Sequence, residues 1–465
     1  MSIVHRSDTI VALATPHGVG AIAVIRLSGA DAVTICNKVF SGKNLKPKDL
    51  SKQKSNTIHF GVINEKDIII DEVLVSLFFA PHSYTGENTA EISCHGSIFI
   101  QQQIIQLLVR AGARIANPGE FTFRAFLNGK FDLSQAEAVA DLIASNSSTS
   151  HQVAMMQMRG GFSDKIKLLR ENLINFASLI ELELDFSEED VEFADRNDLK
   201  TLVIAIQKAI QRLIDSFEVG NVIKNGIPVA IVGKPNAGKS TLLNVLLEEE
   251  RALVSEIPGT TRDTIEDEIN IGGVLFRFID TAGIRDTTDI IESMGVSRTF
   301  EKIKQSAIVI YLFDVHQVTS KELSGIIEEV KKHINKAQLV IVANKIDKED
   351  IDYTRKEFSG FKDVILISAK EKQNIEELKT RLVTLFDNRT VNVTETIVTN
   401  ARHVEALHNT GKALIRVLEG LNNNIPGDLL AIDIRNALYH LGEITGEISS
   451  DDLLENIFSK FCIGK

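Results

Sequence analysis

The sequence predicts a multidomain α/β protein with three parts: an N-terminal α+β domain, a helical bundle domain, and an α/β domain inserted into the helical domain. Short apolar runs separated by turn signals fill residues 1–130, whereas residues 226–385 alternate apolar strands with helical patterns. Long amphipathic helical patterns occupy both flanks of that segment, at 131–225 and 386–465. The two flanks predict one helical domain, because the termini of a domain often lie close together.

Length and composition agree with this division. The chain has 465 residues, which at roughly 150 residues per domain suggests about three domains. With 44% hydrophobic residues and no apolar run long enough to span a bilayer, we expect a globular, cytoplasmic protein with no membrane partner. The net charge of −12 argues against general nucleic-acid binding, which would then depend on a local basic patch or a partner protein.

The N-terminal part is predicted to be a small α+β domain. Four apolar runs are typical of strands and cover residues 22–27, 58–63, 68–70 and 73–79. Apolar residues recur at near-helical spacing over about 98–112, which predicts a helix there.

The helical part begins with a capping pattern. Ser134 and Glu137 fit S-x-x-E, which predicts a capping box at the start of a helix. Apolar residues spaced by threes and fours predict two further helices, through 166–180 and 202–217, and the pattern is helical again from about 395 to 460. Long helices with few strands indicate a bundle.

The central part contains five nearly continuous apolar runs. Such runs are typical of the buried strands of a parallel sheet. They cover residues 227–232, 276–279, 307–313, 339–343 and 364–367.

The first of these strands leads into a phosphate-binding motif. Gly233-Lys-Pro-Asn-Ala-Gly-Lys-Ser240 fits the pattern G-x-x-x-x-G-K-[ST]. The backbone N–H groups of such a loop surround phosphate oxygens, and the following helix N-terminus adds positive potential. We expect Lys239 to reach the β- and γ-phosphates and the Ser240 hydroxyl to bind Mg²⁺. A glycine-rich turn without a nucleotide is the alternative interpretation.

Three further segments follow later strands. Asp280-Thr-Ala-Gly283 offers a carboxylate on the magnesium side and an amide for the γ-phosphate. In Asn344-Lys-Ile-Asp347, the last carboxylate can accept hydrogen bonds from N1–H and the 2-amino group of guanine, which adenine lacks. Ser368-Ala-Lys370 can complete the base pocket. The four motifs resemble the Ras-like P-loop GTPase superfamily and predict GTP rather than ATP.

The motif set lacks the glutamine with which many small GTPases orient the attacking water, because Ile284 stands at that position. An asparagine inside the phosphate loop, here Asn236, resembles potassium-activated GTPases, in which K⁺ takes the place of an arginine finger. The alternative for Asn236 is a turn residue without catalytic weight. The expected K⁺ ligands are Asn236, Ser255, Ile257 and Thr260, and the expected Mg²⁺ ligands are Ser240 and Thr261. The residues expected to bind GTP are Asn236, Ala237, Gly238, Lys239, Ser240, Thr241, Ser255, Glu256, Ile257, Pro258, Gly259, Thr260, Thr261, Asp280, Thr281, Ala282, Gly283, Asn344, Lys345, Asp347, Ser368, Ala369 and Lys370.

Both ends of the chain carry motifs that a generic GTPase lacks. The N-terminal part contains Ala14-Thr-Pro16, Val24-Ile-Arg-Leu-Ser-Gly29, Ser83-Tyr-Thr-Gly-Glu87, His95-Gly96 and Pro118-Gly-Glu-Phe121. These are followed by Arg124-Ala-Phe-Leu-Asn128, Leu133-Ser-Gln-Ala-Glu-Ala138 and the terminal Cys462-Ile-Gly-Lys465. With these motifs, the whole chain resembles the MnmE (TrmE) family of tRNA-modification GTPases.

The resemblance implies a homodimer formed through the N-terminal domains. Each domain would hold a tetrahydrofolate derivative, in the 5,10-methylene or 5-formyl form, as a one-carbon donor. The resemblance also implies an FAD-dependent partner, MnmG, in a heterotetramer or larger complex. That complex places an aminomethyl or carboxymethylaminomethyl group on carbon 5 of the wobble uridine of certain tRNAs. The residues that match the family's folate pocket are Arg26, Glu91, Lys130 and Lys465, which by themselves are typical of surface ion pairs.

The resemblance further implies a catalytic role for Glu292, which acts on the attacking water through a second water, beside Asn236 and Lys239. A surface charge is the alternative for Glu292. Two other functions stay open from the residues: a ribosome-assembly-type GTPase switch with docking domains, and a stand-alone folate-dependent transferase with a regulatory GTPase. A basic RNA-binding tail would favour the first, but the chain ends in an acidic helical region.

The chain has three cysteines, Cys36, Cys94 and Cys462. Their odd number argues against a disulfide framework, and none are spaced as metal-binding pairs. Each is expected to be buried as a small hydrophobe. Cys462, so near the C-terminus, is also a candidate nucleophile.

Overall fold

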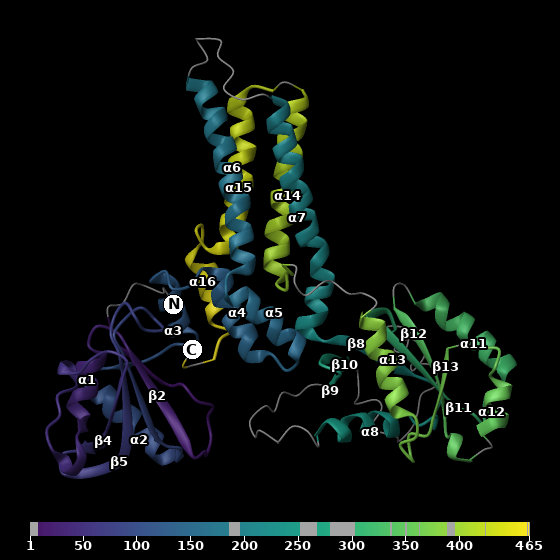
Figure 1. Ribbon diagram of the computed structural model, residues 1–465, viewed down its shortest axis with the longest axis horizontal. Coiled ribbons are helices and arrows are strands. Elements are labelled where there is room, and N and C mark those ends of the chain that lie inside the picture. The colour runs from purple at the N-terminus through teal and green to yellow at the C-terminus, as the bar shows by residue number, and fades with distance from the viewer. Residues whose placement is uncertain are drawn as a thin grey trace. The chain divides into compact units, whose positions relative to one another are not determined.

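The computed structural model has a sheet domain at the N-terminus, a set of long helices, and a second sheet domain (Figure 1). By contacts, the chain forms two compact units, one from the described parts of 1–140, 156–207 and 406–465, and the other from those of 141–155 and 208–405. The structure describes residues 8–185, 196–251, 267–279, 303–334, 337–348, 351–361, 363–387, 396–423, 425–462 and 464, with the backbone alone for 181–185 and 249–251.

The N-terminal sheet has seven strands in the order β3-β4-β5-β6-β2-β1-β7. Its neighbours pair antiparallel, except that β7 runs parallel to β1. One face is covered by α1 and α2, which pack on alternate apolar residues of the strands to form the core. The strands are β1 Ile10–Leu13, β2 Ile22–Ser28, β3 Phe40–Ser41, β4 Thr57–Glu65, β5 Ile68–Phe78, β6 Thr89–His95 and β7 Arg114–Ile115. The helices are α1 Ala32–Val39, α2 Ile98–Arg110 and α3 Glu120–Leu127, with short 3₁₀ turns η1 Lys43–Leu45 and η2 Leu50–Lys52.

The prediction of two separate strands at 68–70 and 73–79 is wrong, because β5 runs through both without a break. Asp71 and Glu72 resemble a turn in the sequence, yet they pair with Ile63 and Val62 of β4. The buried Asp71 carboxylate is satisfied there, because it accepts hydrogen bonds from the backbone N–H of His95 at 2.8 Å and from its Nδ1 at 2.7 Å.

Several large apolar side chains of this sheet are exposed. Ile22, Ile58, Phe60 and Leu74 are 66%, 67%, 44% and 45% exposed, respectively. They alternate along β2, β4 and β5 with the buried residues that pack beneath α1 and α2, so they occupy the opposite face of the sheet. This face of the sheet therefore leaves several large apolar side chains in contact with solvent.

The helical segments are long, and α6 packs along α15 (Figure 1). The capping box predicted with Ser134 as the cap is wrong, because the helix begins at Leu133 and Asp132, two residues before Ser134, is the cap. Asp132 Oδ1 accepts from the backbone N–H of Gln135, and Gln135 Oε1 accepts from the N–H of Asp132, both at 3.0 Å. Ser134 lies inside the helix and donates to Asp132 Oδ1. The helices are α4 Leu133–Ala144, α5 Ser148–Met158, α6 Gly161–Asp185, α7 Arg196–Asn225, α14 Ala401–Asn422, α15 Gly427–Thr445 and α16 Asp451–Phe458.

The second sheet has six strands in the order β13-β12-β11-β8-β10-β9. All neighbours run parallel except β9 and β10, which form an antiparallel hairpin. Apolar side chains on both faces of the sheet are buried, which explains the continuous apolar runs of the sequence. The strands are β8 Ile227–Val232, β9 Asp267–Ile271, β10 Val274–Phe278, β11 Ile308–Asp314, β12 Gln338–Asn344 and β13 Val364–Ile367. The helices are α8 Lys239–Arg251, α11 Ser320–His333, α12 Ile351–Glu357 and α13 Ile375–Asp387, with a 3₁₀ turn η4 Ile346–Lys348.

The two ends of the α/β segment meet. Ser216 Oγ on α7 accepts a hydrogen bond from the N–H of Val398 at 3.1 Å. Ile223 and Ile397 share a buried apolar cluster with Val153 of α5. The chain therefore leaves the helical part and returns to it at neighbouring points, as expected for an inserted domain. The predicted fold class, with α+β, helical and inserted α/β parts, is confirmed.

Candidate active site

The phosphate-loop motif directly follows β8 at the carboxyl edge of the sheet, where ligands of parallel α/β sheets bind. Gly238 in this loop has φ of +101°, and a Cβ on it would lie 2.3 Å from the Asn344 side-chain amide. Only glycine fits both the left-handed backbone and this close approach. The loop is thus packed against the end of another strand.

Lys239 begins α8 and directs its ammonium group back at the loop. Its Nζ donates to the carbonyls of Gly233 at 2.8 Å and Lys234 at 3.1 Å. Ser240 follows in the first turn of the helix and is half-buried. A cation, a hydroxyl and a helix N-terminus therefore converge where an anion is favoured.

Asn344, the last residue of β12, joins three segments. It is 2% exposed, its Nδ2 donates to the carbonyl of Ala237 at 2.8 Å, and its Oδ1 accepts from the N–H of Ala369 at 3.0 Å. The phosphate loop and the segments at 344–347 and 368–370 are therefore held together by one side chain.

The carboxylate of Asp347 lies beside this junction. Its Oδ1 accepts from the Ser368 hydroxyl at 2.6 Å. That hydrogen bond holds the pKa of the Asp347 carboxyl below its ordinary value, so the group is ionised at neutral pH. An ionised carboxylate at this edge accepts hydrogen bonds only, and the N1–H and 2-amino group of guanine are suitable donors. Lys370 is exposed and pairs with Glu371 at 3.3 Å.

Asp314 is a polar residue of this edge that the sequence interpretation missed. It ends β11, is 5% exposed, and its Oδ2 accepts from Lys345 Nζ at 2.7 Å. The signal was present in the sequence, because a carboxylate directly follows the apolar run 307–313.

Other predicted site residues lie outside the described residues. Among the described residues, the structure brings together the predicted GTP-binding residues of the phosphate loop, 236–241, and those of the segments 344–347 and 368–370. Those outside are Ser255, Glu256, Ile257, Pro258, Gly259, Thr260, Thr261, Asp280, Thr281, Ala282, Gly283, Glu292 and Lys465.

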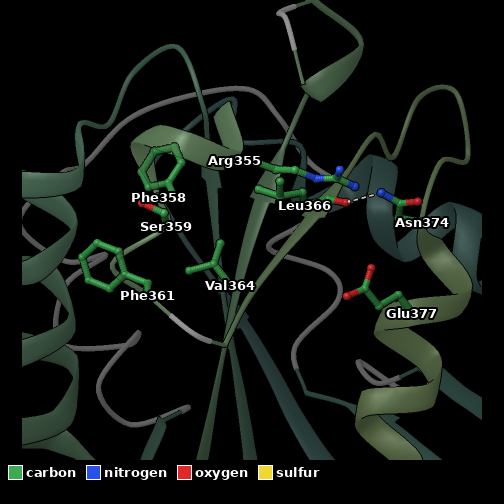
Figure 2. Close-up of a pocket in the computed structure, with 8 residues that line it drawn as sticks. All are labelled: Arg355, Phe358, Ser359, Phe361, Val364, Leu366, Asn374 and Glu377. Carbon is green, nitrogen blue, oxygen red and sulfur yellow. Dashed lines mark hydrogen bonds between the residues drawn. The ribbon is translucent and has the colours of Figure 1, made fainter. Parts of the chain in front are cut away.

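A separate cavity of about 220 Å³ lies beside β13, between α12 and α13 (Figure 2). Asn374 closes one side by donating to the carbonyl of Leu366 at 2.8 Å. None of its lining residues belongs to the phosphate loop or to the segments around Asn344, so it is not the nucleotide site. The lining residues are Arg355, Phe358, Ser359, Phe361, Val364, Leu366, Asn374 and Glu377.

In the N-terminal domain, two of the predicted folate residues form an ion pair. Arg26 and Glu91 are partners in the register of β2 and β6, and Arg26 Nε lies 2.8 Å from Glu91 Oε1. The Arg26 guanidinium also lies 5.3 Å from the ring centre of Tyr84 and 5.7 Å from that of Phe121. This arrangement gives a charged pair beside two aromatic rings.

Lys130 belongs to the same region. A Cβ on Gly86 would lie 3.5 Å from Lys130 Cε, which places the lysine side chain beside the loop that carries Tyr84. Buried Arg124 holds this loop, because its Nη1 donates to Glu87 Oε1 at 3.2 Å. Ser28 Oγ donates to the other oxygen of the Glu87 carboxylate at 2.7 Å.

The C-terminal tail reaches the N-terminal domain within the same unit. The N–H of Gly119 donates to the carbonyl of Cys462 at 3.3 Å, and Gly464 is buried against Leu13. The expectation that Cys462 is buried is wrong, because the residue is exposed. Cys36 and Cys94 are buried as expected, and burial raises the pKa of their thiols to about 12 and about 11.

A phosphate loop after the first parallel strand, tied through Asn344 to a carboxylate suited to guanine, defines a P-loop GTPase domain carried on a helical scaffold. The family model of the MnmE helical domain matches residues 133–462, and that of the GTP-binding protein TrmE N-terminus matches residues 9–130. The chain belongs to the MnmE (TrmE) family of tRNA-modification GTPases.

Curated relatives match over their full length. A protein of Cytophaga hutchinsonii described as tRNA modification GTPase MnmE is 58% identical over 464 residues, covering 100% of this chain and 99% of the relative. One of Flavobacterium johnsoniae with the same description is 59% identical, covering 98% of this chain and 99% of the relative.

Among solved structures, a GTP-binding protein from the archaeon Sulfolobus solfataricus in complex with GDP matches at 20% identity, with a TM-score of 0.27. The match covers 48% of this chain and 68% of that one. In the described part of the chain, no helix combines the length and apolar character needed to cross a membrane.

Proposed function

We propose that this chain hydrolyses GTP and, together with an FAD-dependent partner of the MnmG kind, modifies carbon 5 of the wobble uridine of certain tRNAs with an aminomethyl or carboxymethylaminomethyl group. The observation that carries the GTPase part is Asn344, whose two hydrogen bonds join the phosphate loop to the segments around Asp347 and Ser368. The full-length match to tRNA modification GTPases supports the tRNA part. The proposal is tested by analysis of tRNA nucleosides from a strain depleted of this protein. Loss of the wobble modification is expected, and an unchanged nucleoside profile would contradict the proposal.

In the proposed GTP site, each described residue has one role. Lys239 contacts the β- and γ-phosphates, and Ser240 supplies a hydroxyl to Mg²⁺ together with Thr261. Asp347 recognises guanine, and the segment 368–370 completes the base pocket. Glu292, outside the described residues, acts on the attacking water through a second water.

We propose K⁺ as the activating cation, held by Asn236 with Ser255, Ile257 and Thr260. The described part of the site fits this ion, because Asn236 is exposed on the loop with φ of 61°, and K⁺ prefers amide and carbonyl oxygens. When bound there, K⁺ would offset negative charge that develops between the phosphates.

The K⁺ assignment predicts a GTP hydrolysis rate at least about tenfold higher in KCl than in NaCl at equal ionic strength. The Asn236→Ala variant is expected to lose this difference while it still binds GTP. Equal rates of the unaltered protein in the two salts would contradict the assignment.

We propose that the N-terminal domain binds a tetrahydrofolate derivative, in the 5,10-methylene or 5-formyl form, which supplies a one-carbon unit when bound. The residues present fit it, because Arg26 and Glu91 offer charged partners for its carboxylates and pterin N–H groups, and Tyr84 and Phe121 offer flat apolar surface. Lys130 lies beside the same loop, and Lys465 is the fourth residue of the set.

The folate assignment is tested by titrating the full chain with 5-formyl-tetrahydrofolate. Arg26→Ala is expected to weaken binding at least about tenfold, because a charge-assisted hydrogen bond is lost. Arg110→Ala is the matched control, since Arg110 pairs with Glu65 in the same domain at an exposed position. Equal affinities of the two variants would contradict the assignment.

We propose a homodimer formed through the N-terminal domains, which joins MnmG in a heterotetramer or larger complex in the cytoplasm. The exposed face with Ile22, Ile58, Phe60 and Leu74 supports the dimer, because a second copy would remove this apolar surface from water. With a net charge of −12, the chain leaves much of the tRNA contact to its partner. Cys462 stays a candidate nucleophile, since it is exposed.

A further inference from the structure

Five parallel strands, β10, β8, β11, β12 and β13, end at the same edge of the second sheet. Four of them lead into segments of the proposed GTP site. The fifth, β11, ends in Asp314, to which that site gives no role. Ligands of such sheets bind outside the carboxyl ends of the strands, so the position of Asp314 is one where a side chain acts on the ligand or on its neighbours.

The contacts of Asp314 point to a neighbour. It stands opposite Asn344 in the register of β11 and β12, and its Oδ2 accepts from Lys345 Nζ at 2.7 Å. Its other oxygen accepts from the N–H of His316 at 3.0 Å. Burial alone would raise the pKa of Asp314, but the bonds from Lys345 and His316 outweigh it and keep the pKa below its ordinary value. The side chain is therefore a buried carboxylate paired with one lysine.

The backbone of Lys345 has an unusual conformation. Its φ is +70°, in the left-handed region that a residue with a Cβ adopts at a cost. On one side, Asn344 is fixed by its bonds to Ala237 and Ala369. On the other side, the short turn at 346–348 carries Asp347. The ion pair with Asp314 fixes the residue between them.

We propose that Asp314 is a positioning residue for GTP, which acts by holding Lys345 in its left-handed conformation so that the Asp347 carboxylate faces the base. This inference rests on the proposed GTP site. It adds the end of β11 to the elements that form that site, and it assigns to Asp314 no contact with the nucleotide.

The test is the kinetics of GTP hydrolysis by the full chain with Asp314→Asn, Lys345→Met and both changes together. Asp314→Asn is expected to raise KM for GTP about tenfold and to change kcat less than about twofold, because a charge-assisted hydrogen bond is weakened and the phosphate loop is unaltered. The double variant is expected to match Lys345→Met alone, because Asp314 acts through Lys345. Glu357→Gln is the matched control, since Glu357 accepts from the N–H of Ser320 in the same domain and lies on α12, outside the segments that hold Asp314 and Lys345.

The outcomes separate the inference from the site on which it rests. If the unaltered chain does not bind GTP, the proposed site is wrong. If it does bind GTP, two results would overturn the inference and leave the proposed site standing. One is an unchanged KM in Asp314→Asn, and the other is a rise in KM in the double variant equal to the product of the two single rises. A purely structural role would also overturn the inference. It would show as a lower melting temperature of Asp314→Asn without nucleotide, together with a fall in kcat as large as the rise in KM. If Asp314→Asn does not fold, the pair is tested from Lys345, where Lys345→Arg is expected to keep a lower KM than Lys345→Met, and equal values overturn the inference.

Discussion

The side chain of Asn344 is almost fully buried and uses both ends of its amide, toward Ala237 and Ala369. Truncation would leave a buried carbonyl and a buried N–H without partners, each at a cost of about 1–3 kcal/mol. At this scale the site depends on single polar groups that join segments far apart in sequence. The neighbouring carboxylates, Asp314 and Asp347, hold their charge because Lys345 and Ser368 satisfy them.

Asp347→Asn is predicted to change base preference. A carboxylate can accept from both the N1–H and the 2-amino group of guanine, whereas an amide offers an N–H that suits the 2-carbonyl of xanthine. We expect kcat/KM for GTP to fall at least about 100-fold and that for xanthosine triphosphate to rise. Steady-state kinetics with both nucleotides check this, and a variant that keeps its selectivity for GTP would refute the role of Asp347.

At the scale of elements, the hairpin of β9 and β10 is bonded to the loop between α4 and α5 and to the first turn of α5. The carbonyl of Gly273 accepts from Thr149 Oγ1 at 3.0 Å and from Ser148 Oγ at 3.3 Å. Asn270 Nδ2 donates to the carbonyl of Asn146 at 3.0 Å, and Asn146 donates to Glu268. Hydrogen bonds thus join the hairpin to these helical segments, and Val222 of α7 also packs against the apolar cluster that includes the hairpin.

Thr149→Val is predicted to loosen this hairpin. The substitution keeps the shape but removes the hydroxyl, at a cost of about 1 kcal/mol. Amide hydrogen exchange in 267–278 is expected to become faster, whereas Thr380→Val, which removes a similar hydroxyl from an exposed position of α13, is expected to leave it unchanged. Equal exchange rates in the two variants would show that the contact does not hold the hairpin.

The polar network around Arg124 gives the N-terminal domain a pH dependence. The bond from Arg114 lowers the pKa of Asp8, and the bonds from Arg114, Asn117 and Arg124 lower the pKa of Glu120 despite its burial. Both pKa values are lower in the folded state, so the two ionised carboxylates stabilise the fold. This stabilisation is complete above the ordinary pKa values of 3.8 and 4.5, and it is lost as the pH falls through the lowered pKa values.

The free energy of unfolding is therefore predicted to fall steeply as the pH drops from about 5 to 3. Asp8→Asn is expected to be less stable than the unaltered chain at pH 7 and to show a shallower fall. Urea unfolding across this range checks both expectations, and parallel pH curves for the two proteins would contradict them.

Helices and strands could be predicted from the sequence where one local pattern dominates. Continuous apolar runs followed by motif residues indicate the parallel strands and most of the site edge, and the fold class follows from the change of period along the chain. Pairings between distant segments leave no such signal. Asp71 resembles a strand break in the sequence, but it lies within β5, where its carboxylate is bonded to His95. The bond between Asp314 and Lys345 likewise joins residues 31 positions apart. The predicted cap differs from the observed one because two overlapping capping patterns fit the sequence. One pairs Ser134 with Glu137, and the other, which the structure uses, pairs Asp132 with Gln135.

At the scale of the whole chain, the α/β domain is attached at both ends to neighbouring points of the helical part. Only Gly226 separates α7 from β8, and the returning segment is fixed on α7 by the bond from Val398 to Ser216. The α/β domain is therefore connected to α7 through both its entering and its returning chain segments. We propose that GTP hydrolysis is transmitted along this connection to the folate site and the partner protein.

We propose that one chain couples guanine-specific GTP hydrolysis to one-carbon transfer onto tRNA. It is tested most directly by nucleoside analysis of tRNA incubated with the full chain, the FAD-dependent partner, GTP and a 5,10-methylene-tetrahydrofolate donor. We expect Asp347→Asn at limiting GTP and Arg26→Ala at limiting folate each to lower the wobble-uridine modification at least about tenfold, although the first still binds folate and the second still hydrolyses GTP. Undiminished modification by either variant would contradict it.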